Sequence, residues 1–399
     1  RRWILIFQVI DDKKDCQGFY TQGEFIYGKR PNNLNITWSY GDHVGSDDIT
    51  CLQLYCNGKT IEEVCPEDLQ ERLKARKGRI KAFLRSFVTA KVRLADICLY
   101  DVIPRHHLRH FLDVKNEICE FVLNNYERPK NYSFLSKTQE MAHDISQQNV
   151  QINWSLLKKL ASYDKKAMSL SKRFWGTNPV VNYNIFGTKT GRLGVHEGSF
   201  PILNLKKENR GIVIPNNDFF LELDFNGAEL RALLSLSGTP QPDGDIHEWN
   251  VENIFNGELE RDEAKKKLFA WLYNPSSDAI RSEHYDRKKV LDKYYADGYV
   301  QTPFGRKIES DDFHSLNYLL QSASSDNCIT QVNKIHRFLR QKKTNVAFII
   351  HDSVILDLSH EDRYLIPQII ELFEDTRLGK FKSNMKIGKN LGDMREFSW

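Results

Sequence analysis

Residues 219–234 read FFLELDFNGAELRALL. The first five predict a buried strand that ends at Asp224, and Ala228–Leu234 predict the helix that follows. A carboxylate at the end of a strand is held rigidly while it faces open space, which suits a hard cation such as Mg²⁺. The alternative is that Asp224 only caps the following helix.

A second acid is expected in a similar setting near the C-terminus. Val346–Ile350 and Val354–Leu356 each predict a strand, and the residues between them, His351-Asp352-Ser353, predict a hairpin with an acid at its tip. The plainer interpretation of this polar triplet is an ordinary turn. Two strand-end acids on one sheet, however, can share two metal ions about 3.5–4 Å apart. Such ions lower the pKa of an attacking hydroxyl and neutralise the charge of a phosphoryl group in transfer.

A basic helix is predicted between the two acids, over residues 261–273, RDEAKKKLFAWLY. Its residues Arg261, Lys265, Phe269 and Tyr273 recur every four positions, so they form a stripe along one side. The two cations are suited to binding a triphosphate, and the two aromatic rings to stacking on a sugar and a base. An amphipathic helix with a basic outer face is the alternative interpretation.

The composition is that of a globular protein. The 399 residues suffice for two or three domains, with 40% hydrophobic and 28% charged residues. The net charge of +4 permits a nucleic-acid partner without requiring one. Basic residues cluster between Glu71 and Arg93, where a duplex backbone would be attracted; a solvated helix face is the alternative.

Several classes of protein are disfavoured. The seven cysteines include no CxxC pair, so we expect neither a zinc site nor a disulfide framework, and a reducing compartment. No apolar run approaches 18 residues and no secretory pattern is present, so we expect no membrane association and a cytoplasmic location, in a bacterial host if a phage encodes the chain. The chain begins with Arg1-Arg2 rather than Met, so we expect residues to precede it.

The pattern of the chain changes along its length. Strand-like alternation at 3–7, 18–20 and 25–27 gives way near Pro66 to helical spacing, with helices expected at 108–125, 138–147 and 154–163, the last capped by Asn153. From about Val180, strands, turns and helices alternate. We therefore expect a strand-rich region at 1–65, a helical region at 66–178, and a region of mixed structure at 179–399.

The two acid-containing segments and the basic helix between them together resemble the corresponding segments of family A DNA polymerases, the group that includes bacterial polymerase I and the T-odd phage replicases. Asp224–Arg231 is similar to motif A, the stripe Arg261, Lys265, Phe269 and Tyr273 to motif B, and His351-Asp352-Ser353 to motif C. Further similar segments follow in the family's order at 149–153, 190–193, 245–247 and 302–307, and at Asn317, Gln321 and Asp326. The resemblance extends from about Gln148 to the C-terminus.

The resemblance implies a role for each matching residue. Asp224 and Asp352 would hold two Mg²⁺ ions, replaceable by Mn²⁺, with the Phe225 carbonyl as a further ligand. The incoming dNTP would contact His247, Arg261, Lys265, Phe269, Tyr273 and Glu229. Of these, Lys265 would also protonate the leaving pyrophosphate, while Phe269 and Glu229 would crowd the sugar and exclude a 2′-hydroxyl. Primer–template DNA would contact Arg192, Thr302, Arg306, Asn317, Gln321 and His351.

The implied protein is a template-dependent DNA polymerase that extends a primer 3′ end. Its fold would be α+β, a right-hand polymerase fold with an antiparallel palm sheet, helical fingers and a reduced or atypical thumb, beside a small N-terminal α/β region. The palm would comprise 179–240 and 301–399, and the fingers 241–300. The helical region at 66–178 would be thumb-like or linking, and the region at 1–65 either a degenerate exonuclease or an unrelated small domain. We expect a monomer that works with a processivity or replisome partner, because the stretch from Asn153 to Thr190 is short for the family's thumb.

The sequence departs from the family at informative positions. Ser353 stands where Glu is usual, as in single-subunit phage-type RNA polymerases, so an RNA polymerase or primase is an alternative. Gly227 is typical of the phage replicases, and Asn274 replaces the usual Gly after Tyr273. The N-terminal third lacks the Asp-x-Glu strand motif, so we expect no working proofreading exonuclease. A catalytically inactive DNA-binding homologue is the remaining alternative.

Overall fold

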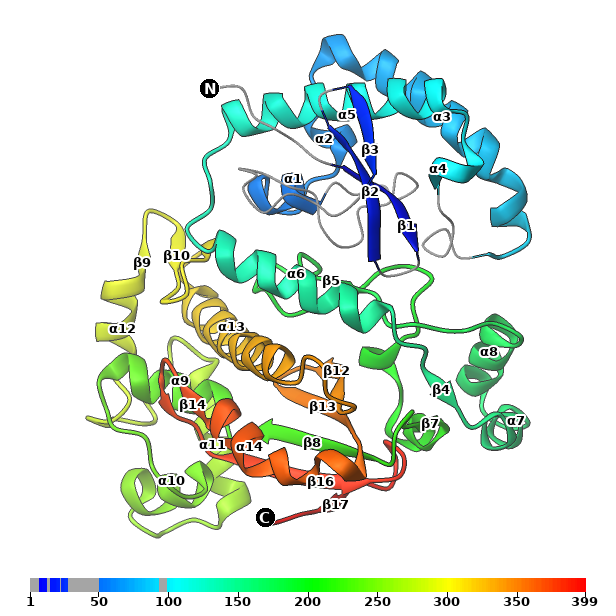
Figure 1. Cartoon of the computed structure of the whole chain (residues 1–399). Coiled ribbons are helices and arrows are strands. Elements are labelled where there is room, and N and C mark those ends of the chain that lie inside the picture. Colours follow the sequence, from blue (N-terminus) through cyan, green and yellow to red (C-terminus); the bar gives the residue numbers. More distant parts are fainter. Residues whose placement is uncertain (1–6, 13–14, 22, 28–49, 93–98) are drawn as a thin grey trace. The chain divides into compact units, whose positions relative to one another are not determined.

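The computed structural model describes residues 7–12, 15–21, 23–27, 50–92 and 99–399. The chain divides into two compact units, Arg1–Gln147 (unit 1) and Gln148–Trp399 (unit 2) (Figure 1). The strand predicted at 3–7 lies outside the described residues except at Phe7, where the first strand begins.

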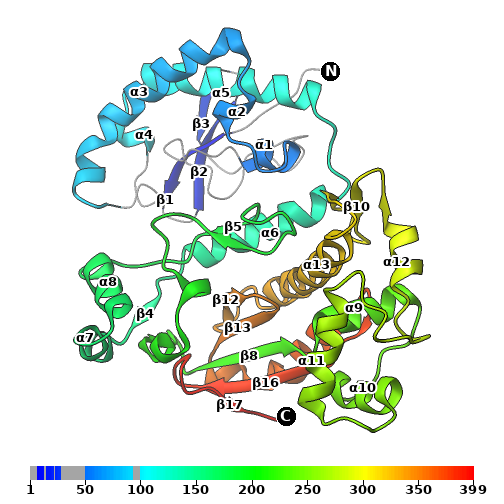
Figure 2. The same cartoon turned by 180° about the vertical axis from the view of Figure 1, so that it is seen from behind.

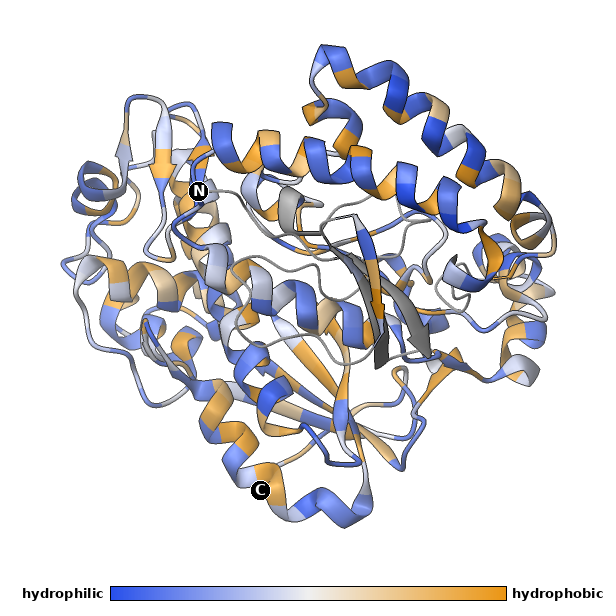
Figure 3. Cartoon of the chain, turned by 45° about the horizontal axis from the view of Figure 1, so that its top comes forward, coloured by the Kyte–Doolittle hydropathy of each residue, from blue (hydrophilic) through white to orange (hydrophobic). Residues whose placement is uncertain are grey.

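Unit 1 combines a small sheet with helices. The antiparallel sheet has the order β1 (Phe7–Asp12), β2 (Asp15–Thr21), β3 (Glu24–Tyr27). The helices are α1 (Thr50–Tyr55), α2 (Ile61–Val64), α3 (Glu67–Thr89), α4 (Leu99–Val102), α5 (Arg105–Asn125) and α6 (Tyr132–Ser146). Hydrophobic and hydrophilic residues alternate at helical intervals along α3 and α5 (Figure 3), and their apolar residues share one core. The helices predicted at 108–125 and 138–147 are therefore confirmed, each beginning earlier than expected.

Unit 2 is organised around a five-stranded antiparallel sheet (Figure 2). Its order is β12 (Asn345–Ile350), β13 (Ser353–Leu358), β8 (Phe219–Phe225), β16 (Ser383–Gly388), β17 (Arg395–Glu396). The long helix α13 (Ser315–Phe338) and α14 (Ile366–Glu374) pack against each other and against strands of this sheet. The central strand β8 pairs with β13 on one side and β16 on the other, so its end is held rigidly.

Further helices lie beyond the end of β8 in sequence. They are α9 (Ala228–Ser237), α10 (Ile246–Phe255), α11 (Arg261–Leu272) and α12 (Arg287–Tyr294). A small sheet follows, in the order β11 (Lys307–Glu309), β10 (Tyr299–Gln301), β9 (Tyr295–Ala296). The other elements of unit 2 are β4 (Gln151–Ile152), α7 (Trp154–Ala161), α8 (Lys165–Phe174), β5 (Tyr183–Asn184), β6 (Gly194–Val195), η2 (Ile202–Asn204), η3 (Lys207–Ile212), β7 (Val213–Ile214), η4 (His360–Leu365), β14 (Asp375–Thr376) and β15 (Gly379–Lys380). No helix in the described ranges has the length and apolar character needed to cross a membrane.

The boundary between β8 and α9 shows whether Asp224 caps the helix that follows it. β8 continues through Phe225, and the N-cap of α9 is Gly227. The interpretation of Asp224 as a helix cap is therefore wrong. Gly227 has a left-handed backbone (φ 68°), and a Cβ there would lie 2.5 Å from Cγ2 of Ile246, so both conformation and close packing require glycine.

Two other predictions need small corrections. The hairpin between β12 and β13 has a two-residue tip, His351-Asp352, because Ser353 already pairs with Ile350 in the sheet. Helix α11 ends at Leu272, so Tyr273 is its C-cap rather than its last turn. The cap predicted for α7 is confirmed, since the Asn153 side chain accepts a hydrogen bond from the Leu156 N–H at 3.0 Å.

Candidate active site

Two carboxylates meet at one end of the central sheet. Asp224 is the penultimate residue of β8, and its partner in the antiparallel register is Ser353 of β13. Asp352 directly precedes Ser353 at the hairpin tip. His351 enters this tight turn with φ 56°, a conformation that non-glycine residues seldom adopt and that often marks a functional position. The sheet register thus places the two predicted acids on adjacent strand ends.

The site disfavours two bare negative charges. Burial, then the charges of Glu222 and Asp352, raise the pKa of Asp224 to about 7, although Lys386 and Lys265 act in the opposite direction. Buried carboxylates with perturbed pKa values that lie side by side are candidates for a functional site.

Asp352 is also a largely buried carboxylate. Burial raises its pKa, opposed by the positive charges of Arg192 and His351. Its Oδ1 is buried and has no hydrogen-bond partner in the part of the chain that the structure describes. Mg²⁺ binds through one or two carboxylates and otherwise keeps water and phosphate oxygens, so Asp224 and Asp352 fit this ion.

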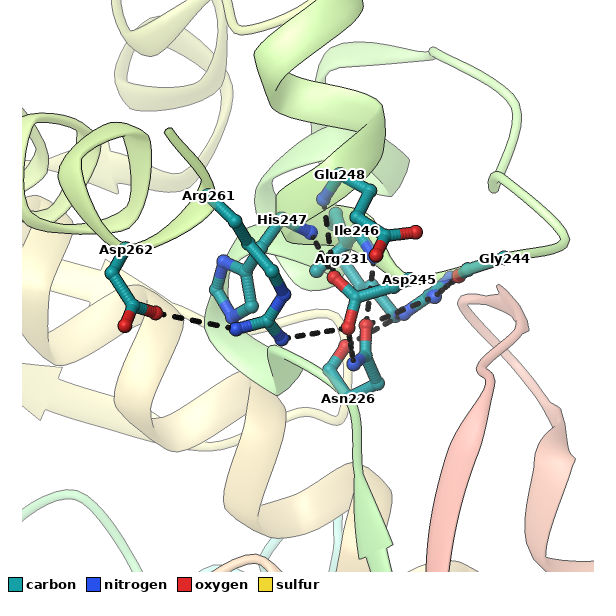
Figure 4. Close-up of polar contacts among 9 residues, drawn as sticks. All are labelled: Asn226, Arg231, Gly244, Asp245, Ile246, His247, Glu248, Arg261 and Asp262. Atoms are coloured by element: carbon teal, nitrogen blue, oxygen red, sulfur yellow. Dashed lines mark hydrogen bonds and ion pairs between the residues drawn. The ribbon is translucent and has the colours of Figure 1, made fainter. Parts of the chain in front are cut away.

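Helices α10 and α11 are tied to the end of β8 by a polar network (Figure 4). Asp245 caps α10 by accepting hydrogen bonds from the backbone N–H of His247 (2.7 Å) and Glu248 (3.1 Å). Its Oδ2 accepts from Arg261 Nη2 at 2.7 Å and from Asn226 Nδ2 at 2.9 Å. Partial burial raises the pKa of Asp245, but these hydrogen bonds outweigh it and lower the value to about 2. Arg261 is consequently oriented by an ionised partner.

Arg231 supports this network from inside the protein. It is fully buried, and burial lowers its pKa to about 10. Its guanidinium donates to the carbonyls of Asn226 (2.8 Å), Pro242 (2.9 Å) and Gly244 (2.6 Å). No role was predicted for Asn226 or Arg231 from the sequence. The available signal was an arginine inside an apolar helical run, Leu230–Leu234, which indicates a buried cation that needs acceptors.

The stripe on α11 faces His247 of α10. The His247 ring lies 6.3 Å from the Phe269 ring, centroid to centroid, and His247 is buried while Lys265 is exposed. Burial, then the positive charge of Lys265, lower the pKa of His247 to about 4. Since the charge of Lys265 also lowers the pKa of Asp224, this lysine lies within electrostatic reach of both groups. His247 is therefore a neutral imidazole at pH 7.

The low pKa of His247 predicts a specific loss of stability in acid. An unfolded histidine gains its proton near pH 6.5, whereas the folded one does so near pH 4, so protonation stabilises the unfolded state as the pH falls between these values. This group should contribute on the order of 3 kcal/mol that is present above pH 6.5 and lost by pH 4. His247→Gln should lose correspondingly less stability than the wild type between pH 7 and pH 4 in urea denaturation. Equal losses in the two proteins would contradict the shift.

A second cluster connects α9 to the end of α11. Glu229 accepts a hydrogen bond from Arg192 Nη2 at 2.8 Å and another from the Tyr273 hydroxyl. Burial raises the pKa of Glu229, opposed first by Tyr273 and then by Arg192, while the charge of Asp352 raises it further. Phe269 stacks on Tyr273 with ring centroids 5.9 Å apart. Glu229 thus joins two predicted binding residues, Arg192 and Tyr273, and lies within electrostatic reach of Asp352.

Arg306 is engaged inside the fold. Its Nε and Nη2 donate to the two oxygens of Asp326 at 3.1 and 2.7 Å, and Asp326 is fully buried. Gly191 has φ 82°, and a Cβ there would lie 2.4 Å from Cζ of Arg306, so glycine allows the close approach. The contact predicted between Arg306 and the template stays a prediction. The ion pair itself joins the β10–β11 turn to α13, and the Gly191 carbonyl accepts a hydrogen bond from Ser325 of the same helix at 3.2 Å.

The remaining predicted residues have local partners. The Thr302 hydroxyl accepts from the Arg306 N–H at 3.1 Å within the β10–β11 turn, and Gln321 donates to Asn317 on α13. The Phe225 ring stacks on Phe373 at 4.1 Å, which anchors the end of β8; the role of its carbonyl stays a prediction.

Ser353 has a structural explanation. It is buried, and its hydroxyl donates to the Ile350 carbonyl at 2.9 Å, closing the hairpin below Asp352. The residue that departs from the family's motif C therefore supports the turn in this chain, and its hydroxyl is already engaged.

Comparison with known proteins finds similarity in structure alone. No protein-family model matches the sequence, and no curated protein matches it. Among solved structures, the POL domain of Pol1 from M. smegmatis, in complex with DNA primer–template and dNTP, is similar with a TM-score of 0.55 over 79% of each chain, at 14% sequence identity. The chain has a DNA polymerase fold.

This likeness confirms the predicted α+β class and the right-hand polymerase fold with its antiparallel sheet. At this identity it shows the fold and no more, because one fold can host different activities. The five predicted segment ranges, the roles of individual residues and the kinship with phage replicases stay predictions.

Proposed function

We propose that the chain is a template-dependent DNA polymerase that adds dNTPs to a primer 3′ end by two-metal-ion nucleotidyl transfer. The observation that carries this proposal is the pairing of Asp224 and Asp352 on adjacent strand ends. Both pKa values are raised there, and Asp352 Oδ1 has no hydrogen-bond partner among the described residues. The polymerase fold gives these acids a setting in which a phosphoryl-transfer site is expected.

Asp224 and Asp352 would hold two Mg²⁺ ions, with Mn²⁺ as a substitute and the Phe225 carbonyl as a further ligand. The bound ions would lower the pKa of the primer 3′-hydroxyl and neutralise charge on the phosphoryl group. The raised pKa values support this assignment, since a divalent cation removes the repulsion between the carboxylates.

Arg261, Lys265 and His247 would bind the incoming triphosphate. Arg261 is held in place by ionised Asp245, so little conformational entropy would be lost when it binds a phosphate. Lys265 forms no ion pair with any described residue, which leaves its ammonium available to phosphate oxygens and to protonate the leaving pyrophosphate. Neutral His247 would donate an N–H without adding charge.

The sugar and base would lie against Glu229, Phe269 and Tyr273. Glu229 is fixed between Arg192 and Tyr273, so it would be a rigid barrier to a 2′-hydroxyl. The primer strand would contact Arg192, Gln321 and His351, and the template strand Thr302, Arg306 and Asn317. Of these side chains His351 is exposed at the hairpin tip, as a contact with the primer end requires.

Primer extension on a DNA template of known sequence tests the proposal directly. With Mg²⁺ we expect templated extension with dNTPs, no extension with rNTPs, and an unchanged primer when no nucleotide is present. Extension with rNTPs would favour an RNA polymerase or primase. Binding of primer–template without extension would favour an inactive homologue, and a shortened primer without nucleotides would contradict the expected lack of proofreading.

We also propose that the enzyme is a phage-replicase-like monomer that depends on a partner for processivity. The helices between Asn153 and Thr190 are the short α7 and α8, which would give a small grip on duplex DNA. Long products from single binding events by the chain alone would contradict this.

A further inference from the structure

A row of aromatic rings lies on two helices of unit 1, which contributes none of the site residues described above. Phe83 of α3 lies 5.5 Å from His107 of α5, His107 lies 3.9 Å from His106, and His106 lies 6.5 Å from His110, all between ring centroids. Arg79 precedes Phe83 by four residues and Arg76 precedes it by seven, so both arginines lie on the same side of α3 as Phe83. We call these six residues the α3–α5 ring surface: Arg76, Arg79, Phe83, His106, His107 and His110.

This surface concentrates positive charge. The pKa of His107 is lowered, first by partial burial and then by the charges of His106, Arg79, His110 and Arg76. Within the described ranges neither Arg76 nor Arg79 forms an ion pair. Accumulated charge of one sign costs free energy and attracts a polyanion.

The pairing of Arg72 on the same helix shows the contrast. Arg72 makes a bidentate ion pair with Glu117 of α5, with N–O distances of 2.8 and 2.7 Å. Opposite charges on α3 and α5 are therefore paired at Arg72, whereas the positive charges of the α3–α5 ring surface are not paired in this way by any described residue.

The rings of Phe83, His106 and His110 are accessible, whereas His107 between them is half-buried. Leu73, Ile80 and Leu84 of α3 are buried, whereas Phe83 is 36% exposed. His106 and His110 are exposed as well. Neighbouring exposed rings flanked by cations are what unpaired bases and their phosphates require, because every base has a face that can stack on an aromatic ring. A duplex keeps its bases stacked inside, so it would use only the cations.

We propose that the α3–α5 ring surface binds single-stranded nucleic acid. Bases stack on Phe83, His106 and His110, and phosphates bind Arg76 and Arg79. This activity is separate from primer extension, since all of its residues belong to unit 1 and none belongs to the carboxylate site.

The test uses the full chain and a fluorescent oligo(dT) strand, with excess unlabelled blunt duplex DNA present to occupy duplex sites. Fluorescence anisotropy should show binding that weakens about tenfold in Phe83→Leu and is largely retained in Phe83→Tyr, which keeps a ring. Arg76→Gln with Arg79→Gln should reduce the slope of log K against log salt by about 1.4, the value for two phosphate contacts to a single strand.

A matched double variant separates a site from general charge. Lys81→Gln with Arg85→Gln removes the same charge from the opposite side of α3, where both residues are exposed. Binding should change little in this control. Equal weakening in both double variants, equal affinity of Phe83→Leu and wild type, or loss of the signal to the blunt duplex would each overturn the proposal.

Circular dichroism of each variant checks that α3 and α5 remain folded. Leucine is chosen at position 83 because an apolar side chain there still covers the residues that pack against Phe83. Primer extension at saturating primer–template, measured in parallel, should be unchanged in Phe83→Leu. A chain that binds oligo(dT) through Phe83 but extends no primer would refute the proposed polymerase activity and leave this inference standing.

Discussion

Replacing Asp352 with Asn is expected to slow primer extension on the order of a thousandfold, because the neutral amide removes one of the two carboxylates that would hold the catalytic ions. Asn keeps the size of the side chain and can still occupy the two-residue hairpin tip. Single-turnover extension with saturating primer–template and dNTP measures the rate. Affinity for primer–template, measured separately by anisotropy, should change far less than the rate.

Glu222 provides the matched control. It lies two residues before Asp224 on the same face of β8, and its charge acts on the pKa of Asp224. Glu222→Gln therefore removes an equal charge from the same face without removing a proposed ligand, and its effect on the rate should be small. Comparable losses in the two variants would show that general electrostatics, and not the carboxylate pair, controls the activity.

Stability gives Asp352→Asn a second readout. Burial raises the pKa of Asp352, so its charged form is disfavoured in the folded protein without metal. In EDTA at pH 8 the variant should therefore be at least as stable as the wild type, because a neutral amide replaces a poorly partnered charge. A residue that loses activity without losing stability is functional, whereas a marked destabilisation would identify Asp352 as structural.

The sequence sufficed to locate the carboxylate pair and the helix α11 because these depend on local patterns. An apolar strand ending in an acid and a four-residue repeat of cations and rings are visible without knowledge of the tertiary structure. The sheet register then places Asp224 of β8 beside the hairpin tip that holds Asp352, as expected for two acids at strand ends of one sheet.

Contacts between distant segments could not be predicted in the same way. Asn226 follows a strand, Asp245 precedes a helix, and Arg231 lies within another helix, yet they form one network with Arg261. Nothing in the local pattern specifies which acid pairs with which arginine, because the pairing depends on how α9, α10 and α11 pack. The requirement for glycine at Gly227 likewise arises from the approach of α10.

The local sequence motif around Arg306 predicts a contact with the template, whereas the structure shows a buried ion pair. Its turn, Thr302–Lys307, resembles a template-contacting loop, whereas the structure pairs the Arg306 guanidinium with Asp326 on α13. The side chain of Arg306 is 10% exposed and that of Asp326 0% exposed, so both charges depend on each other. The template role and the structural role lead to different outcomes when the pair is broken.

Arg306→Ala is expected to destabilise the protein by about 3–5 kcal/mol, because it leaves the Asp326 carboxylate buried without its partner. Urea denaturation measures the shift of the transition, and Lys307→Ala, an exposed neighbour, is the control. Arg306→Met combined with Asp326→Leu should recover most of the loss, since an apolar pair of similar volume needs no charge compensation. If Arg306→Ala instead left stability unchanged and weakened only template binding, the ion pair would contribute little and the template contact would explain the arginine. Recovery in the double variant without recovery of extension would show that Arg306 acts in both ways, with the buried pair setting stability and the guanidinium also needed by the template.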